Sequence, residues 1–241
     1  MSTNIHAAQK PLIYQIGKHV KLVDDATFCK SIIADGKELI TGKESGEIRV
    51  PELNDEKVYI TFKEDLTSLA NAFSGCSALK SIPENFFANC PKATDFSFTF
   101  FGCKALTTIP EKLFANNPAV TDFTNTFMNC MKLTAIPTGL FAHNPEVTDF
   151  SGTFALCSAL ESIPKNLFAN NRKVTDFSYT FTGCYALTGE SPYTMIGDKK
   201  VHLYERANYP EHFTKLTVFW ECFKNCTGLT DYAQIPTNWK E

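Results

Sequence analysis

Nine cysteines and five histidines are the residues that could hold a metal ion or carry thiol chemistry. The best candidate metal ligands, two histidines and two cysteines of the C-terminal region, are His202, His212, Cys222 and Cys226. Thiolate and imidazole are the ligands that structural zinc prefers, but the two histidines are ten residues apart, so the sequence favours no metal. An odd number of cysteines leaves at least one thiol unpaired. A Cys222–Cys226 or Cys184–Cys222 disulfide stays an alternative.

Five of the cysteines recur at a constant spacing of 27 residues: Cys76, Cys103, Cys130, Cys157 and Cys184. A constant period in this range indicates stacked repeats. Equivalent residues of stacked coils lie about 4.8 Å apart and point the same way, whereas a disulfide needs Cβ atoms about 3.8 Å apart and turned toward each other. We therefore predict a file of buried thiols, which behave as small apolar side chains.

Four aspartates recur with the same period: Asp95, Asp122, Asp149 and Asp176. One interpretation is a cation-binding stripe, because like charges about 5 Å apart repel each other unless a cation lies between them. The favoured interpretation is that each aspartate caps a helical turn that follows it.

No motif of a known catalytic or nucleotide-binding site occurs in the chain. A P-loop, a dinucleotide-binding glycine motif, a nucleophile elbow and a metalloprotease helix motif are all missing from the sequence. The net charge of −3 gives no electrostatic reason to expect nucleic acid or an anionic membrane as partner. We predict no catalytic residue, no cofactor, no metal site and no membrane-spanning segment.

The neighbours of the cysteines keep the same step and define the coil that must position them. They are Phe73, Phe100, Phe127, Phe154 and Phe181; Leu79, Leu106, Leu133, Leu160 and Leu187; and Ile82, Ile109, Ile136 and Ile163, each followed by proline. In one coil, the spacing of Phe123, Phe127 and Cys130 predicts a short helical turn, and residues 133–136 predict a brief strand that ends at Pro137. Residues 138–144 then predict a second helical turn, and the Asn116-Asn117 and Asn170-Asn171 pairs predict turns or an asparagine ladder between coils.

The repeated run resembles the leucine-rich repeats of BspA-like bacterial surface proteins. It is seen at residues 99–110, covers about residues 66–190 and has a divergent last copy around residues 223–236. The resemblance implies an α/β leucine-rich-repeat solenoid with short parallel strands and short helical turns, in 27-residue coils capped at both ends. It also implies a cell-surface or secreted protein with a role in adhesion or protein binding. The first residues lack the apolar core of a signal peptide, so either a leader was removed or the protein stays inside the cell.

The two ends differ from the repeat and are predicted to cap it. Residues 1–65 form an N-terminal β-rich cap, with strands at residues 12–16, 38–41, 47–50 and 57–62 and turns at Asp35-Gly36 and Ser45-Gly46. Residues 66–190 form the repeat region of about five coils. Residues 191–241 hold an insert, predicted to be a loop or hairpin, then the last repeat and a C-terminal cap in which Trp220 and Trp239 close the open end. The insert's tyrosines are alternatively a binding patch.

The first functional hypothesis is a non-enzymatic module that binds a protein or glycan surface. Side chains that vary from coil to coil form its candidate face: Lys80, Ser81, Thr107, Thr108, Thr134, Ala135, Glu161, Ser162 and Tyr185, with Phe101, Met128 and Met131 beside the cysteines. The alternatives are a structural spacer in a surface or phage-like assembly and, less favoured, an enzyme that uses His202 and His212 of the insert.

Overall fold

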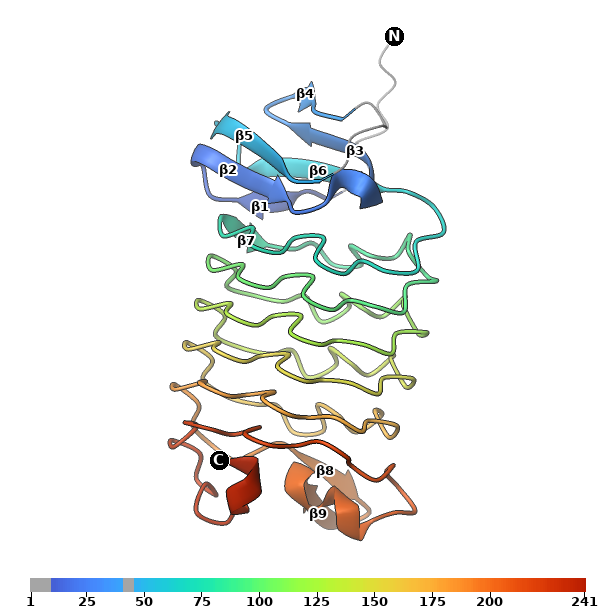
Figure 1. Ribbon diagram of the computed structural model, residues 1–241, viewed down its shortest axis with the longest axis vertical. Coiled ribbons are helices and arrows are strands. Elements are labelled where there is room, and N and C mark those ends of the chain that lie inside the picture. Colours follow the sequence, from blue (N-terminus) through green and yellow to red (C-terminus); the bar gives the residue numbers. More distant parts are fainter. Residues whose placement is uncertain (1–9, 41–45) are drawn as a thin grey trace.

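The computed structural model describes residues 10–40 and 46–241. Figure 1 shows a molecule in three tiers, with antiparallel sheets at the N-terminal end, a stack of irregular coils in the middle, and a hairpin with short helical segments at the C-terminal end.

The N-terminal tier consists of short strands that pair antiparallel throughout. One sheet has the order β4-β3-β6-β1-β7, and a second sheet pairs β2 with β5. The strands are β1 (Leu12–Tyr14), β2 (Gly17–Val23), β3 (Cys29–Ala34), β4 (Lys37–Glu38), β5 (Ile48–Leu53), β6 (Lys57–Phe62) and β7 (Leu79–Ser81); η2 (Ala26–Phe28) is a 3-10 turn. Because β7 belongs to the first coil and pairs with β1, the sheet is continuous with the stack.

Each coil lies in register on the next, 27 residues later up to the coil of Phe181 and 42 residues later for the last coil, which follows the insert. Alternate backbone N–H groups donate across to the following coil, as from Phe96 to Asp122 at 3.0 Å and from Phe98 to Thr124 at 2.8 Å. The N–H groups between them close turns within the coil, as from Thr99 to Phe96 at 3.1 Å. The backbone is therefore paired alternately along the stack and within the coil, and the extended pieces that result are single-residue parallel bridges.

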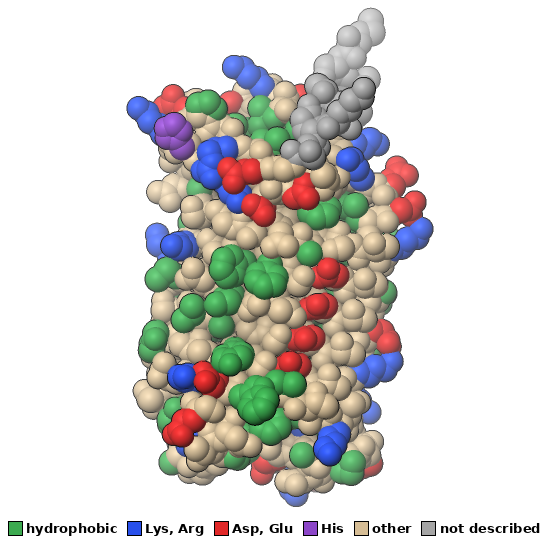
Figure 2. Space-filling view, viewed as in Figure 1, with side chains coloured by type: hydrophobic (Ala, Val, Ile, Leu, Met, Phe, Trp, Pro, Cys, Tyr) green, Lys and Arg blue, Asp and Glu red, His purple; other side chains and the backbone are tan. Residues whose placement is uncertain are grey.

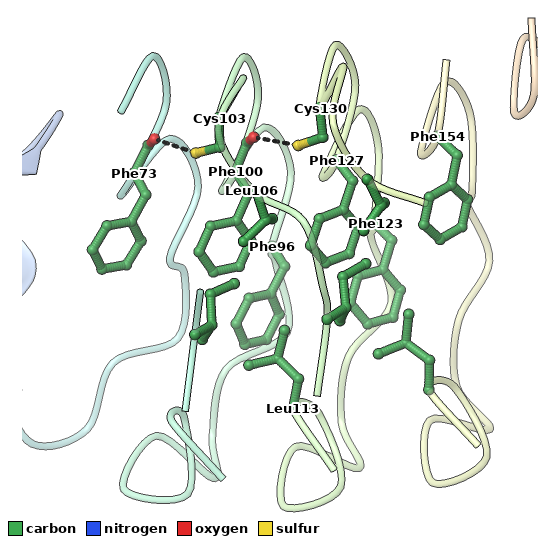
Figure 3. Packing of buried hydrophobic residues seen from close by; sticks show 14 of the residues in the cluster. Phe73, Phe96, Phe100, Cys103, Leu106, Leu113, Phe123, Phe127, Cys130 and Phe154 are labelled. Carbon is green, nitrogen blue, oxygen red and sulfur yellow. Dashed lines mark hydrogen bonds between the residues drawn. The ribbon is translucent and has the colours of Figure 1, made fainter. Parts of the chain in front are cut away.

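The interior consists of files of identical side chains. Successive rings in the file of Phe73, Phe100, Phe127, Phe154, Phe181 and Phe223 stack at 5.4–5.8 Å with interplanar angles of 5–12°. Beside this file, the thiol of Cys103 donates to the carbonyl of Phe73 at 3.3 Å and that of Cys130 to Phe100 at 3.3 Å (Figure 3). All nine cysteines are buried free thiols, as predicted for the five in register.

The predicted fold class, an α/β leucine-rich-repeat solenoid with short parallel strands and short helical turns, is wrong. Every ladder of the named strands is antiparallel. The described residues contain no α-helix, only the 3-10 segments η2, η3 (Leu203–Asn208) and η4 (Thr237–Trp239). Residues 133–136 contribute one isolated bridge, at Ala135, and both predicted helical pieces of this coil are runs of turns.

Left-handed residues explain why an apparently helical spacing does not form helices. In the coil of Phe127, Asn125 and Asn129 have φ of 53° and 64°. An α-helix requires a run of right-handed residues, so one left-handed residue every few positions ends each turn as soon as it has closed. The spacing of three to four between Phe123, Phe127 and Cys130 therefore reflects successive turns.

The predicted asparagine ladder is present inside the stack. The Nδ2 of Asn144 donates to the carbonyls of Phe114 and Asn117 in the preceding coil at 3.0 and 2.9 Å, and Asn117 and Asn171 each make the equivalent pair of bonds to the coil before their own. The ladder ends at Arg206, whose guanidinium donates to the carbonyls of Asn171 and Phe168 at 3.2 and 2.7 Å. A residue of the insert thus takes the place that an asparagine of one more coil would occupy.

The insert is a hairpin, in agreement with one of the two forms predicted for it. Strands β8 (Tyr193–Ile196) and β9 (Lys199–His202) pair antiparallel and lead into η3, which carries Arg206. Trp239 of η4 is buried and stacks on Phe219 at 4.9 Å, as expected of a plug. Trp220 is 59% exposed, so its predicted role as a second plug is wrong.

In the N-terminal tier, the strand at residues 57–62 and the turn at Asp35-Gly36 are confirmed. The predicted strand at 12–16 is shorter, the one at 47–50 runs from Ile48 to Leu53, and the one at 38–41 overlaps β4 only at Glu38. Thr41 and Ser45 lie outside the described residues. β2 and β3 were not predicted.

Candidate binding groove

The face predicted from variable residues is largely exposed and lies along one side of the stack. The N–H of Thr107 donates to the carbonyl of Lys80 at 3.2 Å, and that of Glu161 to Thr134 at 3.1 Å. Thr108 and Ser162 are exposed on the same side, while Ser81 and Lys80 are half-buried. Tyr185 belongs to a different file, beside the cysteines, and is 62% exposed.

The candidate metal ligands are not brought together among the described residues, where no group of three or more His, Cys, Asp or Glu side chains is arranged to hold a metal ion. Cys222 and Cys226 are interior residues of the last coil, and Cys226 donates to the carbonyl of Phe181 at 3.0 Å. The imidazole of His202 contacts carboxylates instead, with Nε2 at 2.9 Å from Glu190 and Nδ1 at 3.1 Å from Glu205.

An apolar groove of about 600 Å³ runs along the stack across four successive coils. Its lining residues are Phe98, Phe101, Asn125, Met128, Ser151, Gly152, Ala155, Leu156, Ser178, Tyr179 and Thr182. Figure 2 shows hydrophobic side chains gathered over the coils. Leu156 is 37% exposed and Tyr179 is 46% exposed. Contiguous exposed apolar surface rimmed by polar residues marks interaction sites.

Three bulky side chains of this groove stand on left-handed backbone. The φ angles are 55° at Phe98, 60° at Leu156 and 58° at Tyr179. Left-handed conformation is routine for glycine and tolerable for asparagine, and costs other residues roughly 1–2 kcal/mol. Each of the three positions therefore carries backbone strain that glycine would avoid and asparagine would reduce.

The equivalent positions in other coils show that the backbone itself does not require these residues. In register with Phe98 and Tyr179 lie Asn71, Asn125 and Gly152, and in register with Leu156 lie Gly75, Gly102, Asn129 and Gly183, all with positive φ. The stack uses asparagine or glycine at most of these positions, as physical chemistry predicts. Four positions depart from this pattern: Phe98, Leu156, Tyr179 and, in the last coil, Glu221. The three apolar or aromatic ones, Phe98, Leu156 and Tyr179, line the same groove.

At the positions in register with Phe98 and Tyr179, the two middle coils carry the smaller residues Asn125 and Gly152, which leave the groove hollow between the two rings. A Cβ on Gly152 would collide with the Oδ1 of Asn125, so the glycine is required by this close approach as well as by its φ of 60°. Between the coils of Phe98 and Tyr179 lie three coil steps, or about 14 Å at the spacing of paired strands.

An acidic file borders the groove. Asp95, Asp122, Asp149 and Asp176 form consecutive parallel bridges. Each accepts a backbone N–H from two residues ahead through Oδ1, as Asp122 does from Thr124 at 2.7 Å. The predicted capping role is thus present, although the structure capped is a turn and not a helix. Figure 2 shows a file of acidic side chains running down the coils beside the hydrophobic group.

The charge of this file is not neutralised within the described residues. None of its four carboxylates forms an ion pair there. Burial, together with the charges of Asp149 and Asp95, raises the pKa of Asp122 against the lowering effect of its bonds to Thr124. Burial, and then the charge of Asp149, raises the pKa of Asp176 against its bonds to Ser178.

A reactive cysteine has a lowered pKa, whereas the pKa values of these thiols are raised. Burial raises the pKa of Cys157 and of Cys226 to about 12 and that of Cys90 to about 11. A thiol with a raised pKa is almost entirely protonated at neutral pH and is a poor nucleophile and metal ligand. The buried cysteines therefore serve as small apolar side chains of the core.

Variability around the cysteines predicted Phe101 and Met128, but Phe98, Leu156 and Tyr179 were missed. Their signal was in the sequence, because each replaces asparagine or glycine at its repeat position. That signal has meaning only once those positions are known to be left-handed, which the helical interpretation of the coil concealed.

These features define the chain as a stack of in-register coils with one exposed apolar groove. No protein-family model matches the chain, and no curated protein matches it. Among solved structures it shows a weak similarity to a leucine-rich repeat protein from Bacteroides ovatus, with 18% sequence identity and a TM-score of 0.20. The similarity covers 72% of this chain and 59% of that one, so the chain spans less than two thirds of that protein. Membership of the BspA-like family is not confirmed.

Among the residues that the structure describes, none belongs to a helix long and apolar enough to cross a bilayer.

Proposed function

We propose that this protein is a non-enzymatic binding module that holds another protein through the groove. The observation that carries the proposal is the placement of Phe98, Leu156 and Tyr179 on strained left-handed backbone around one exposed apolar hollow. Strain that persists at a surface cluster is a mark of a functional site.

The chemistry of the lining supports a protein partner. Aromatic residues and methionine are the types enriched in the centres of protein interfaces, and the groove offers Phe98, Phe101, Met128 and Tyr179. Its polar groups are a few hydroxyls and one amide, on Asn125, Ser151, Ser178 and Thr182 among others. Such a lining suits apolar side chains that leave water on binding.

The test uses a library of random 12-residue peptides displayed on phage and selected on the full chain. Counter-selection uses the variant F98N/L156G/Y179N, which has at each position a residue type that the stack already uses there. Because asparagine and glycine relieve the strain, this variant should fold at least as well as the original. Loss of binding can then be assigned to the groove and not to unfolding.

We expect selected peptides to bind the original chain at least about 30-fold more tightly than the variant, the equivalent of about 2 kcal/mol. Peptides that bind both chains equally, or a library that yields no binder, would contradict the proposal. A matched control is N129G, which changes a residue in register with Leu156 but outside the groove. It should leave binding unchanged.

The polar face with Lys80, Thr108, Thr134 and Glu161 remains a prediction for a second contact surface. A cell-surface or secreted setting likewise remains a prediction from the resemblance of the repeat, and the absence of enzymatic activity is part of this proposal.

A further inference from the structure

We infer that the partner binds by a short segment whose apolar side chains fill the groove while lysine or arginine side chains beside them face the aspartate file. The inference rests on the proposed function and specifies the chemistry of the partner.

The file and the groove are close enough to be contacted by one segment. Asp95 and Phe98 are three residues apart, as are Asp176 and Tyr179, so the lateral separation of the two features is at most about 10 Å. The register is the same in every coil because both features follow the 27-residue step. A lysine or arginine side chain on a bound segment can span this distance.

The aspartates are poised for such a contact. One oxygen of each accepts a turn N–H, and no lysine or arginine of the described residues is paired with any of the four. Partial burial and the charge of neighbouring aspartates raise the pKa of Asp122 and Asp176. A cation that approaches the file offsets the repulsion between the carboxylates. Complementary charge of this kind contributes both specificity and rate of association.

The same charge argues against other occupants. A nucleic acid would bring phosphates against four carboxylates and be repelled. A neutral glycan would find hydroxyl and amide groups but would gain nothing from the aspartate file. Across the 14 Å between the coils of Phe98 and Tyr179, an extended peptide places about four or five residues, enough for two apolar side chains and flanking cations.

The experiment continues from the unbiased peptide library selected on the full chain. The composition of groove-dependent peptides is compared with that of the unselected library, and each Lys or Arg of the tightest binder is then replaced by Gln. Affinities are measured at low and at high salt on the original chain, on D122N/D149N and on F98N/L156G/Y179N. Asparagine keeps the Oδ1 acceptor of each turn and removes only the charge.

We expect enrichment of Lys and Arg next to aromatic or long aliphatic residues. The Lys/Arg→Gln peptide should bind the original chain at least about 10-fold more weakly at low salt, and the difference should fall below about 2-fold on D122N/D149N.

Two results would overturn the inference and are distinguishable from each other. Groove-dependent peptides without basic enrichment, or with equal losses on the original chain and D122N/D149N, would refute the partner chemistry and leave the groove as a binding site. No groove-dependent peptide, together with groove-dependent binding to a neutral oligosaccharide panel, would refute both the inference and the proposed protein-binding function.

Discussion

At the scale of single residues, backbone conformation distinguishes the residues that build the coils from those that we propose bind a partner. The left-handed positions of the coils favour asparagine and glycine, as at Asn125 and Gly152. They disfavour bulky apolar side chains such as those of Phe98, Leu156 and Tyr179. The ring of Phe98 contacts Phe101 of its own turn, with ring centroids 5.9 Å apart, but Leu156 and Tyr179 stay 37% and 46% exposed. Exposed apolar side chains that oppose the local backbone preference point to a contact outside the chain.

Replacing Tyr179 by Asn should therefore stabilise the isolated protein, by about 1 kcal/mol, because asparagine tolerates left-handed backbone. Chemical denaturation followed by fluorescence or circular dichroism measures the free energy of unfolding. The control Y179A removes the same ring but lacks the short polar side chain with which asparagine tolerates left-handed backbone, and should bring no gain. A loss of stability in Y179N would show that the position is not strained.

The aspartate file should make stability depend on pH in a defined direction. The pKa values of Asp122 and Asp176 are raised in the folded chain, so the folded state binds these protons more tightly than the unfolded state. Ionised Asp122 and Asp176 therefore lower stability at neutral pH, and this penalty is lost as pH falls through their folded pKa values.

The variant D122N/D176N should accordingly be more stable than the original chain at pH 7, by up to about 1 kcal/mol. The two chains should converge once the pH is low enough to protonate the carboxyl groups. Thermal unfolding from pH 3 to pH 8 gives the comparison. A variant that is less stable at every pH would mean that the turns need the charge.

At the scale of elements, the unit is a coil that has no regular secondary structure of its own. Its hydrogen bonds alternate between the next coil and its own turns, and its asparagine side chain binds two carbonyls. The Oδ1 atoms of Asn117, Asn144 and Asn171 are buried and have no partner within the described residues. The asparagine side chains thus stabilise the ladder only through the hydrogen bonds that their Nδ2 atoms donate.

Removing one donor should be costly. Asn144→Ala leaves the carbonyls of Phe114 and Asn117 buried without that partner, and we expect a loss of about 2–4 kcal/mol in the free energy of unfolding. The exposed Asn116→Ala serves as the matched control and should change stability by less than about 0.5 kcal/mol. Equal effects of the two substitutions would contradict the role given to the ladder.

The period of 27, the stacking, the buried thiol file and the asparagine ladder could all be predicted from the sequence, because identical residues recur in register only when they pack on one another. Secondary structure within the coil could not. Spacing of apolar residues by three or four is shared by helices and by successive turns, and only the φ angles at positions such as Asn125 and Asn129 distinguish the two. The groove could not be predicted from the sequence either, because its position depends on those φ angles.

At the scale of the whole molecule, the stack is closed at both ends by elements outside the repeat. β1 pairs with β7 at one end. At the other, Arg206 ends the asparagine ladder and Trp239 covers the last phenylalanine ring, Phe223, at 6.1 Å. Burial lowers the pKa of Arg206 to about 9, so it remains charged at neutral pH while it binds the last carbonyls. The interior of the stack is therefore covered at both ends.

Sealing predicts that the thiols are unreactive until the chain unfolds. Treatment with a thiol-specific disulfide reagent should modify fewer than one of the nine cysteines in the folded protein and all nine in strong denaturant. Rapid modification of several thiols in the folded state would mean that the file is accessible.

We propose that recognition takes place in the groove bordered by the aspartates. Mapping of backbone amides by NMR or hydrogen exchange, with and without the selected peptide, tests this claim most directly. Changes should be concentrated at Phe98, Asn125, Gly152 and Tyr179 and at the aspartates beside them. Changes concentrated instead at Thr108, Thr134 and Glu161, with the groove unaffected, would contradict it.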